Sequence, residues 1–175
     1  GSEMCIRDSR DIYGNSLENE TVVLYYTFSG ITTWTPITSD VTDNLGHYHA
    51  VWIPPATGYF TIKAEWNGNT THLETSNTTT LSSLTYNNQY VFSVESNSTV
   101  SGLAFNATDW TLSFTVTGPN GTQGYIKVTV AKNLVESITN IRVYIDGNKT
   151  EYWITSTNDS WLLTFNYIHS NHPVS

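Results

Sequence analysis

The segment that decides the fold is Tyr59-Phe60-Thr61-Ile62-Lys63-Ala64-Glu65-Trp66. From Phe60 onward every second residue is apolar, and the residues between are Thr61, Lys63 and Glu65. Because successive side chains of a β-strand point to opposite faces, this alternation predicts a strand with one buried face. The turn formers Asn67-Gly68-Asn69 follow directly, which indicates a hairpin.

The composition extends this prediction to the whole chain of 175 residues. The residues that favour strands, Val, Ile, Thr, Tyr, Phe and Trp, number 76, whereas the helix formers Ala, Leu, Met, Glu, Gln, Lys and Arg number 35. Aromatic residues make up 13%, and such large rings need burial, which argues against disorder. We therefore expect an all-β protein.

Further strand-like runs recur along the chain, separated by turn residues. In the first half they cover residues 21–28, 31–39, 47–53 and 70–81. In the second half they cover residues 89–95, 98–105, 110–117, 124–130, 141–145, 152–155 and 161–167. The apolar spacing within residues 131–138 fits one helical turn. Strands at such short intervals, with turns between them, are typical of β-sandwiches.

The length allows two small domains, which we place at residues 11–82 and 85–175. The boundary is expected near Ser83-Leu84-Thr85, where the strand patterns of the two halves meet. A domain of this size buries only about 60% of the surface of its unfolded chain, so each would be marginally stable alone. We therefore expect each domain to pack on the other or on neighbouring domains of a parent protein.

Both ends of the chain look like the ends of a fragment. Residues 4–9 read Met-Cys-Ile-Arg-Asp-Ser, which resembles a translated sequencing adapter, and residues 1–10 are therefore excluded from the expected fold as an adapter-like or disordered tail. Cys5 is the single cysteine of the chain, so no intrachain disulfide is possible. The last residues, 169–175, stop within a strand-like pattern.

Charge and hydropathy exclude several classes of protein. The net charge of −8 argues against a nucleic-acid binder that works through a basic surface. No apolar run approaches the ~18–20 residues that span a bilayer, and no signal peptide is visible. Uncharged Ser, Thr and Asn side chains, 63 in all, supply most of the solvation.

The first half carries an ordered set of turn and core residues. In sequence these are Asp43, Gly46, Tyr48, Trp52, Pro54, Gly58 and the strand Phe60–Trp66, preceded by residues 11–22. This order resembles the Ig-like repeat of archaeal and bacterial cell-surface proteins. The resemblance implies an Ig-like β-sandwich that lacks its N-terminal strand or strands, because the tail takes their place.

The second half carries a different set. It comprises residues 92–99, 112–125, 143–147 and 167–172. These segments resemble the membrane-proximal Ig-like domain of large archaeal surface proteins, a family without a known activity. The resemblance implies two Ig-like β-sandwiches in tandem and an extracellular location. It also implies a membrane anchor only beyond the end of this chain.

Two tryptophans are expected to anchor the first core, since Trp52 and Trp66 fall on inward-facing strand positions. Eight Asn-x-Ser/Thr sequons are candidates for N-glycosylation, and several fall in predicted turns where a glycan would be solvated. They are Asn19, Asn69, Asn77, Asn97, Asn106, Asn120, Asn148 and Asn158.

Metal and catalytic sites find little support in the sequence. His47 and His49 share a strand face, but no third ligand is assured, and we interpret them as solvent-facing. Asp40, Asp43 and Asn44 cluster in a turn, where capping of backbone groups is favoured over calcium binding. His169 and His172 are assigned a structural role. No nucleophile elbow or phosphate loop is present, so we expect no catalysis, no cofactor and no metal ion.

The sequence therefore predicts a structural or adhesive ectodomain segment of a prokaryotic surface protein, of the stalk or surface-layer-associated kind. One alternative is a carbohydrate-binding β-sandwich with Tyr13, Trp34, Tyr59 and Trp153 on outer faces, and a remote one is an accessory domain pair of a secreted hydrolase. The expected partners are neighbouring domains, glycans and a second copy, which would pair with the strand edge left open by the missing strand.

Overall fold

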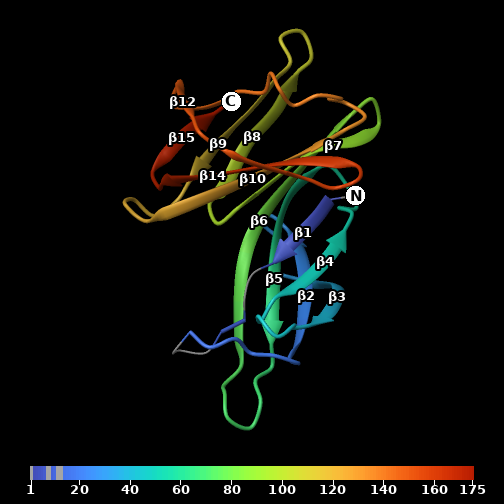
Figure 1. Cartoon of the computed structure of the whole chain (residues 1–175), viewed down its shortest axis with the longest axis vertical. Helices are drawn as coiled ribbons and strands as arrows, with labels where there is room; N and C mark the ends of the chain where they lie inside the picture. Colours follow the sequence, from blue (N-terminus) through green and yellow to red (C-terminus); the bar gives the residue numbers. More distant parts are fainter. Residues whose placement is uncertain (1, 7–8, 11–13) are drawn as a thin grey trace. The chain divides into compact units, whose positions relative to one another are not determined.

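The computed structural model describes residues 2–6, 9–10 and 14–175. These residues form fifteen strands and no helix, so the predicted all-β class is confirmed (Figure 1). The chain divides into two compact units. Unit 1 comprises Gly1–Pro54 and Phe60–Thr78, and unit 2 comprises Pro55–Tyr59 and Thr79–Ser175.

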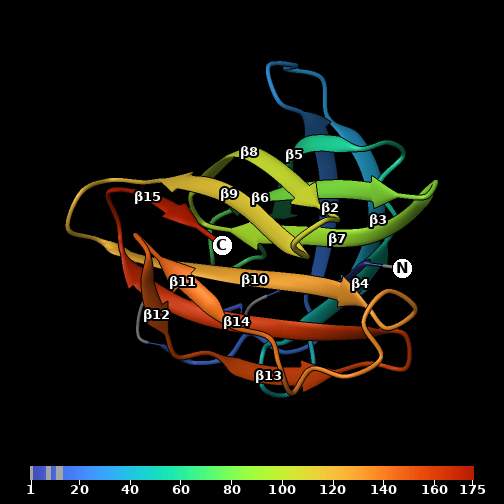
Figure 2. The ribbon, with the colours of Figure 1, turned by 90° about the horizontal axis from the view of Figure 1, so that it is seen from above.

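Unit 2 is a β-sandwich of two antiparallel layers, best seen in Figure 2. In the first layer the strand order is β13 (Trp153–Ser156), β14 (Ser160–Ile168), β10 (Gln123–Ala131), β7 (Gln89–Ser96) and β6 (Thr75–Tyr86). In the second layer the order is β12 (Asn148–Thr150), β11 (Val143–Ile145), β15 (Asn171–Val174), β9 (Thr111–Thr117) and β8 (Thr99–Asn106).

The core of unit 2 lies between these layers. Val94 of β7 and Ile126 of β10 come from the first layer, and Val116 of β9 comes from the second; all three are fully buried. In β10 the core residues Ile126, Val128 and Val130 recur at every second position, as the predicted alternation requires. One continuous apolar cluster thus joins the two sheets.

Unit 1 is smaller and its second layer is narrow. One sheet has the order β5 (Gly58–Trp66), β2 (Thr21–Phe28) and β3 (Thr35–Val41), and the first four residues of β6 also belong to this unit. The other sheet contains β4 (Tyr48–Trp52) paired with β1 (Ser2–Ile6).

Aromatic rings fill the core of unit 1. Phe60 lies 4.7 Å from Phe28 and 5.4 Å from Trp52, between ring centroids, and Trp52 lies 4.7 Å from Tyr26. Trp52 is half-buried in this cluster. Trp66 is buried, and its indole N–H donates to a carboxylate oxygen of Glu20 at 2.9 Å. The two tryptophans proposed as anchors therefore contact different neighbours.

The structure differs from the sequence prediction at residues 2–6. These residues were excluded from the fold, yet they form β1 and pair in register with β4. Main-chain hydrogen bonds do not depend on side-chain identity, so the edge of β4 can accept an extended segment whatever its sequence. The pairing with a second copy, predicted at the edge left open by a missing first strand, stays a prediction. Among the described strands, β3 hydrogen-bonds only to β2 and lies at an edge of its sheet.

A second difference concerns the predicted boundary. Ser83-Leu84-Thr85 lies inside β6 and not in a linker, and the division between units falls after Thr78. Ser82 and Ser83 are buried, and the hydroxyl of Ser83 donates to the carbonyl of Ala56 at 2.9 Å. A run of Ser and Thr is typical of an exposed linker. In the structure the run is part of a strand, and the buried Ser83 hydroxyl is satisfied by a backbone carbonyl.

Candidate functional site

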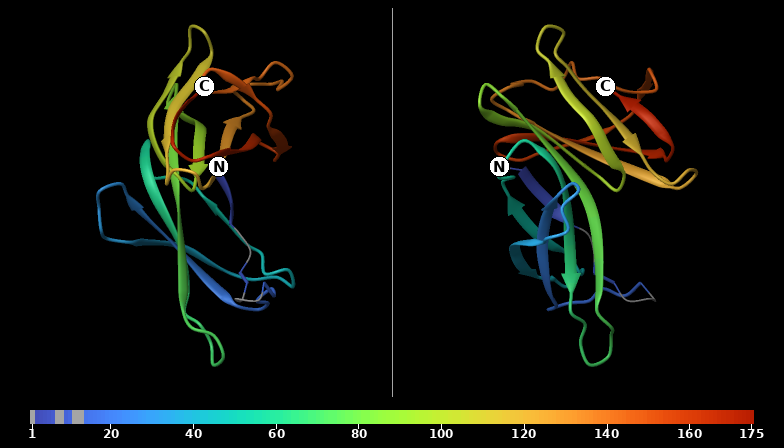
Figure 3. Two further views of the ribbon diagram at one scale, coloured as in Figure 1. Left: turned by 90° about the vertical axis from the view of Figure 1, so that its left-hand side faces the viewer. Right: turned by 180° about the vertical axis from the view of Figure 1, so that it is seen from behind.

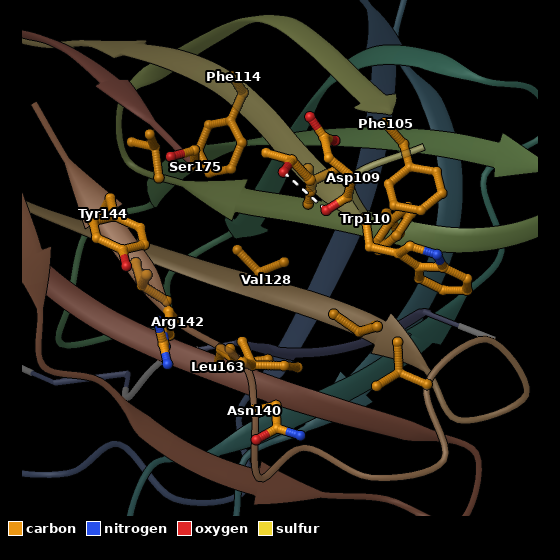
Figure 4. A pocket seen from close by; sticks show the side chains of 18 of the residues that line it. Phe105, Asp109, Trp110, Phe114, Val128, Asn140, Arg142, Tyr144, Leu163 and Ser175 are labelled. Atoms are coloured by element: carbon orange, nitrogen blue, oxygen red, sulfur yellow. Dashed lines mark hydrogen bonds between the residues drawn. The ribbon is translucent and has the colours of Figure 1, made fainter. Parts of the chain in front are cut away.

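A cavity of about 520 Å³ lies within the sandwich of unit 2 (Figure 4). Its walls come from both layers: Phe92, Val128 and Leu163 from the first, and Phe114 and Val143 from the second. All five are buried apolar residues. The interior of the cavity is therefore hydrocarbon and aromatic in character.

The mouth of the cavity is formed by two connections. The turn between β8 and β9, seen as the tip of the yellow hairpin in Figure 3, contributes Asp109 and Trp110. The connection between β10 and β11 contributes Ser137, Asn140 and Arg142. These connections contribute four of the polar residues that line the cavity, whereas the walls that come from the two sheets are mainly apolar.

Trp110 stands out at this mouth. Its side chain is 60% exposed, and its φ of 57° places a bulky residue in the left-handed region. The ring packs edge-on against Phe105, with 5.9 Å between the ring centroids. An exposed ring held on a strained backbone is typical of a residue that serves a site more than a core.

One side chain from β14 and one from the β12–β13 connection hold the β10–β11 connection in place. The indole N–H of Trp161 donates to the carbonyl of Val135 at 2.9 Å, and the hydroxyl of Tyr152 donates to the carbonyl of Ile141 at 2.7 Å. No helix forms at residues 131–138, but the single helical turn expected there is present: the N–H of Val135 donates to the carbonyl of Ala131 at 3.3 Å. The mouth is thus formed by an irregular but anchored segment.

Two opposite charges flank the opening. Arg142 and Asp109 are both exposed, and neither forms an ion pair with any residue in the described part of the chain. Figure 4 shows Asp109 beside Trp110 on one side of the cavity, Arg142 on the opposite side, and Asn140 at a separate position. None of these four residues was singled out from the sequence. An aromatic residue inside the polar turn 106–110 is the one signal that could have indicated the site.

The histidine motif at the end of the chain forms a separate cluster. His169 is 3% exposed, its N–H donates to the carbonyl of Thr122 at 2.7 Å, and its carbonyl accepts from the N–H of Gly121 at 3.0 Å. Its ring atom Nδ1 lies 2.6 Å from the hydroxyl of Thr122, which also lies 2.7 Å from the carbonyl of Pro119. His169 is therefore tied to the β9–β10 turn by both backbone and ring.

This geometry selects one form of His169. The Thr122 hydroxyl has one proton, and the Pro119 carbonyl can only accept, so that proton goes to Pro119. Nδ1 of His169 must then carry the proton that it donates to Thr122. Nε2 is left as a buried lone pair without a hydrogen-bond partner among the described residues.

Two glycines make room for these rings. A Cβ atom on Gly118 would lie 2.4 Å from Cδ2 of His169, and one on Gly124 would lie 2.5 Å from Cζ of Tyr167. The hydroxyl of Tyr167 hydrogen-bonds that of Ser98 inside the sandwich. Close packing is therefore enough to explain why Gly118 and Gly124 stand next to these rings, and no catalytic role is needed.

His172 is placed differently. Its Nδ1 lies 2.6 Å from a carboxylate oxygen of Asp146, and its Nε2 lies 2.8 Å from the carbonyl of Ile168. Since acceptors face both ring nitrogens, the hydrogen bond to Asp146 raises the pKa of His172 above its ordinary value. This pair ties β15 to the β11–β12 turn.

The histidines and acids considered as metal ligands are used locally. One carboxylate oxygen of Asp43 accepts the N–H groups of Leu45 and His47, each at 2.8 Å, and Asp40 accepts that of His49 at 2.6 Å. The hydrogen bond from the His47 N–H lowers the pKa of Asp43. His47 and His49 are exposed. Across residues 2–6, 9–10 and 14–175, no three His, Cys, Asp or Glu side chains gather as metal ligands.

The aromatic residues considered as a sugar platform lie on separate segments. Lys63 covers Trp34, with its ammonium 5.0 Å from the ring centroid, and the hydroxyl of Tyr59 accepts the N–H of Leu103 at 2.9 Å. Trp153 is 65% exposed on β13. Tyr13 lies outside the described residues.

All eight sequon asparagines are exposed. Three of them use the side-chain N–H group, the atom that a glycan would modify: Asn69 donates to Glu20, Asn97 to the carbonyl of Gln123, and Asn148 to that of Asp146. In the described part of the chain the other five donate no such bond; they are Asn19, Asn77, Asn106, Asn120 and Asn158.

No protein-family model matches the chain, and no curated protein or solved structure matches it either. The resemblances drawn from residues 43–66 and 92–172 therefore depend on those residues alone. Within the described residues, no helix has the length and apolar character needed to cross a bilayer.

Proposed function

We propose that this chain is a structural, non-catalytic segment of a prokaryotic cell-surface protein, of the archaeal stalk or surface-layer-associated type. The observation that carries the proposal is the exposure of all eight sequon asparagines on a hydroxyl-rich β-sandwich surface. A surface solvated by hydroxyl and amide groups, with glycans added, stays hydrated with few charges.

The use of the acidic side chains supports a structural role. Glu95 pairs with Lys127, Glu20 accepts from Trp66, and Asp43 caps its own turn. Groups committed to such partners contribute to folding and leave little for proton transfer to a substrate. Adhesion and load bearing then depend on the strand ladders, whose many backbone hydrogen bonds resist extension.

Native modification tests this proposal. The chain is produced in a haloarchaeal host that glycosylates secreted proteins, and its peptides are analysed by mass spectrometry. We expect hexose-containing adducts on the asparagines with free side-chain amides, such as Asn120 and Asn158, and lower occupancy at Asn97, because its amide bonds both Gln123 and the N–H of Tyr125.

The Asn120→Gln variant and the same chain from bacterial cytoplasm are the controls, and both should lack the Asn120 adduct. Unmodified peptides at all eight positions in the secreted protein would argue against an archaeal surface location. Occupancy that is highest at Asn97 would contradict the role assigned to its hydrogen bonds.

A further inference from the structure

We propose that the cavity of unit 2 binds a single-chain amphiphile, with its hydrocarbon body between the two sheets and its acidic head group at the loop mouth. The size of the space supports a ligand. Its 520 Å³ falls within the range of about 300–1,000 Å³ that small-molecule sites occupy. Protein interiors contain few voids larger than a water molecule, so an opening of this size in a small sandwich calls for an occupant.

The chemistry of the walls selects the body of that ligand. Phe92, Phe114 and Leu163 offer no hydrogen-bonding groups to the interior, and neither does Val128 between them. A sugar carries hydroxyls on every side, and these would lose their water without gaining partners in such a space. A hydrocarbon chain gives up no hydrogen bonds on entry and removes apolar surface from water.

The mouth selects the head group. Arg142 is an exposed cation without an ion pair in the described part of the chain, and Asn140, two residues earlier in the same connection, adds an amide to the lining. A carboxylate can accept two parallel hydrogen bonds from a guanidinium. Asp109 stands beside Trp110 on another side and would repel an acid there. These positions place an acidic head group near Arg142.

Trp110 lies at the mouth of the cavity, partly in solvent. Its exposed ring can cover the methylene groups that leave the interior, and amphipathic rings of this kind are favoured where one end of a site is apolar and the other is wet. Because Trp161 and Tyr152 hold the β10–β11 connection, the mouth exists before a ligand arrives. A pre-formed mouth lowers the ordering cost of binding.

The test uses the full chain and a fluorescent fatty acid, 11-(dansylamino)undecanoic acid, displaced by dodecanoic acid or by 1-dodecanol. We expect saturable binding with one site, and displacement by the acid at lower concentration than by the alcohol. Arg142→Gln should remove the advantage of the acid, whereas Lys149→Gln, an exposed cation of unit 2 outside the cavity, should keep it.

A matched pair of exposed tryptophans tests the position of the site. Trp110→Ala should weaken binding about tenfold, and Trp153→Ala, which removes a ring of similar exposure outside the cavity, should leave it unchanged. Val128→Phe fills the cavity and should abolish binding, with folding checked by circular dichroism.

Several results would overturn the proposal. They are the absence of saturable binding, an equal loss in the two tryptophan variants, and unchanged binding in a folded Val128→Phe variant. If Val128→Phe does not fold, the tryptophan pair decides, since both of those side chains are exposed.

Discussion

Unit 1 and unit 2 are built from the same kinds of strand but bury them differently. Unit 2 places one continuous apolar cluster between two five-stranded layers. In unit 1 the ring cluster of Tyr26, Phe28 and Trp52 is only half-buried around Phe60, and the second layer consists of β1 and β4. Strands with alternating apolar residues are therefore buried more completely in unit 2, where the opposite layer has five strands, than in unit 1, where it has two.

The two units also treat charge differently. In unit 2 the ammonium of Lys127 lies 3.1 Å from Glu95, and the two side chains are only 12% and 10% exposed. In unit 1 Lys63 pairs with Glu65, and these side chains are 19% and 34% exposed. Removal of one partner costs more where the remaining charge is shielded from water.

The largest expected effect compares two buried isoleucines. Ile126→Ala in unit 2 and Ile62→Ala in unit 1 remove the same atoms from sites of nearly equal burial, at 0% and 1% exposure. We expect losses in unfolding free energy of about 4 and about 2 kcal/mol, because half-buried rings around Ile62 can collapse into the space. Denaturant unfolding, followed by NMR signals of each unit, measures both, and an equal loss would remove the contrast between the cores.

The two ion pairs sharpen the comparison at a smaller scale. Lys127→Met leaves the carboxylate of Glu95 buried, and among the described residues only the Tyr125 hydroxyl, at 3.1 Å, still donates to it. We expect a loss in unfolding free energy of roughly 3 kcal/mol. Lys63→Met should cost less than about 1 kcal/mol, because its partner meets solvent. The same unfolding experiment applies, and Glu95→Gln combined with Lys127→Met should recover most of the first loss. If Lys127→Met and Lys63→Met lose the same unfolding free energy, the difference in burial does not make the Lys127–Glu95 pair more important than the Lys63–Glu65 pair.

The smallest expected effect is a dependence of the stability of unit 2 on pH through His172. A raised folded-state pKa of His172 means that its contribution is fully present below the ordinary value of 6.5 and is lost as the pH rises through the folded-state pKa. We expect less than about 1 kcal/mol, since Asp146 is half-exposed. An NMR titration should give a pKa of His172 above 6.5 in the wild type and a lower pKa in the Asp146→Asn variant.

Asp43→Asn in unit 1 is the matched control for this titration, because the imidazole of His47 lies 3.7 Å from the Asp43 carboxylate. It should leave the titration of His172 unchanged. If the pKa of His172 is the same in the Asp146→Asn variant as in the wild type, the hydrogen bond to Asp146 does not raise it.

Much of the strand content could be predicted because it is a local property. The alternation in residues 60–66 and 124–130 reflects the period of two of a β-strand, and both segments lie in strands. The turns at Asn67-Gly68 and Asp146-Gly147 follow from residues that tolerate positive φ. The candidate site was beyond such reasoning, since its walls come from strands far apart in the chain and its mouth from two irregular connections.

The amino-acid sequence by itself determined the all-β class, the position of most strands and the surface rich in hydroxyls and sequons. Only the tertiary structure decided that β6 continues through Ser83–Thr85, that residues 2–6 pair with β4, that Nε2 of His169 is a buried lone pair, and that a cavity opens beside Trp110. The physical reason is range: strand and turn preferences act between neighbouring residues, whereas pairing, burial and cavity shape depend on which distant segments meet.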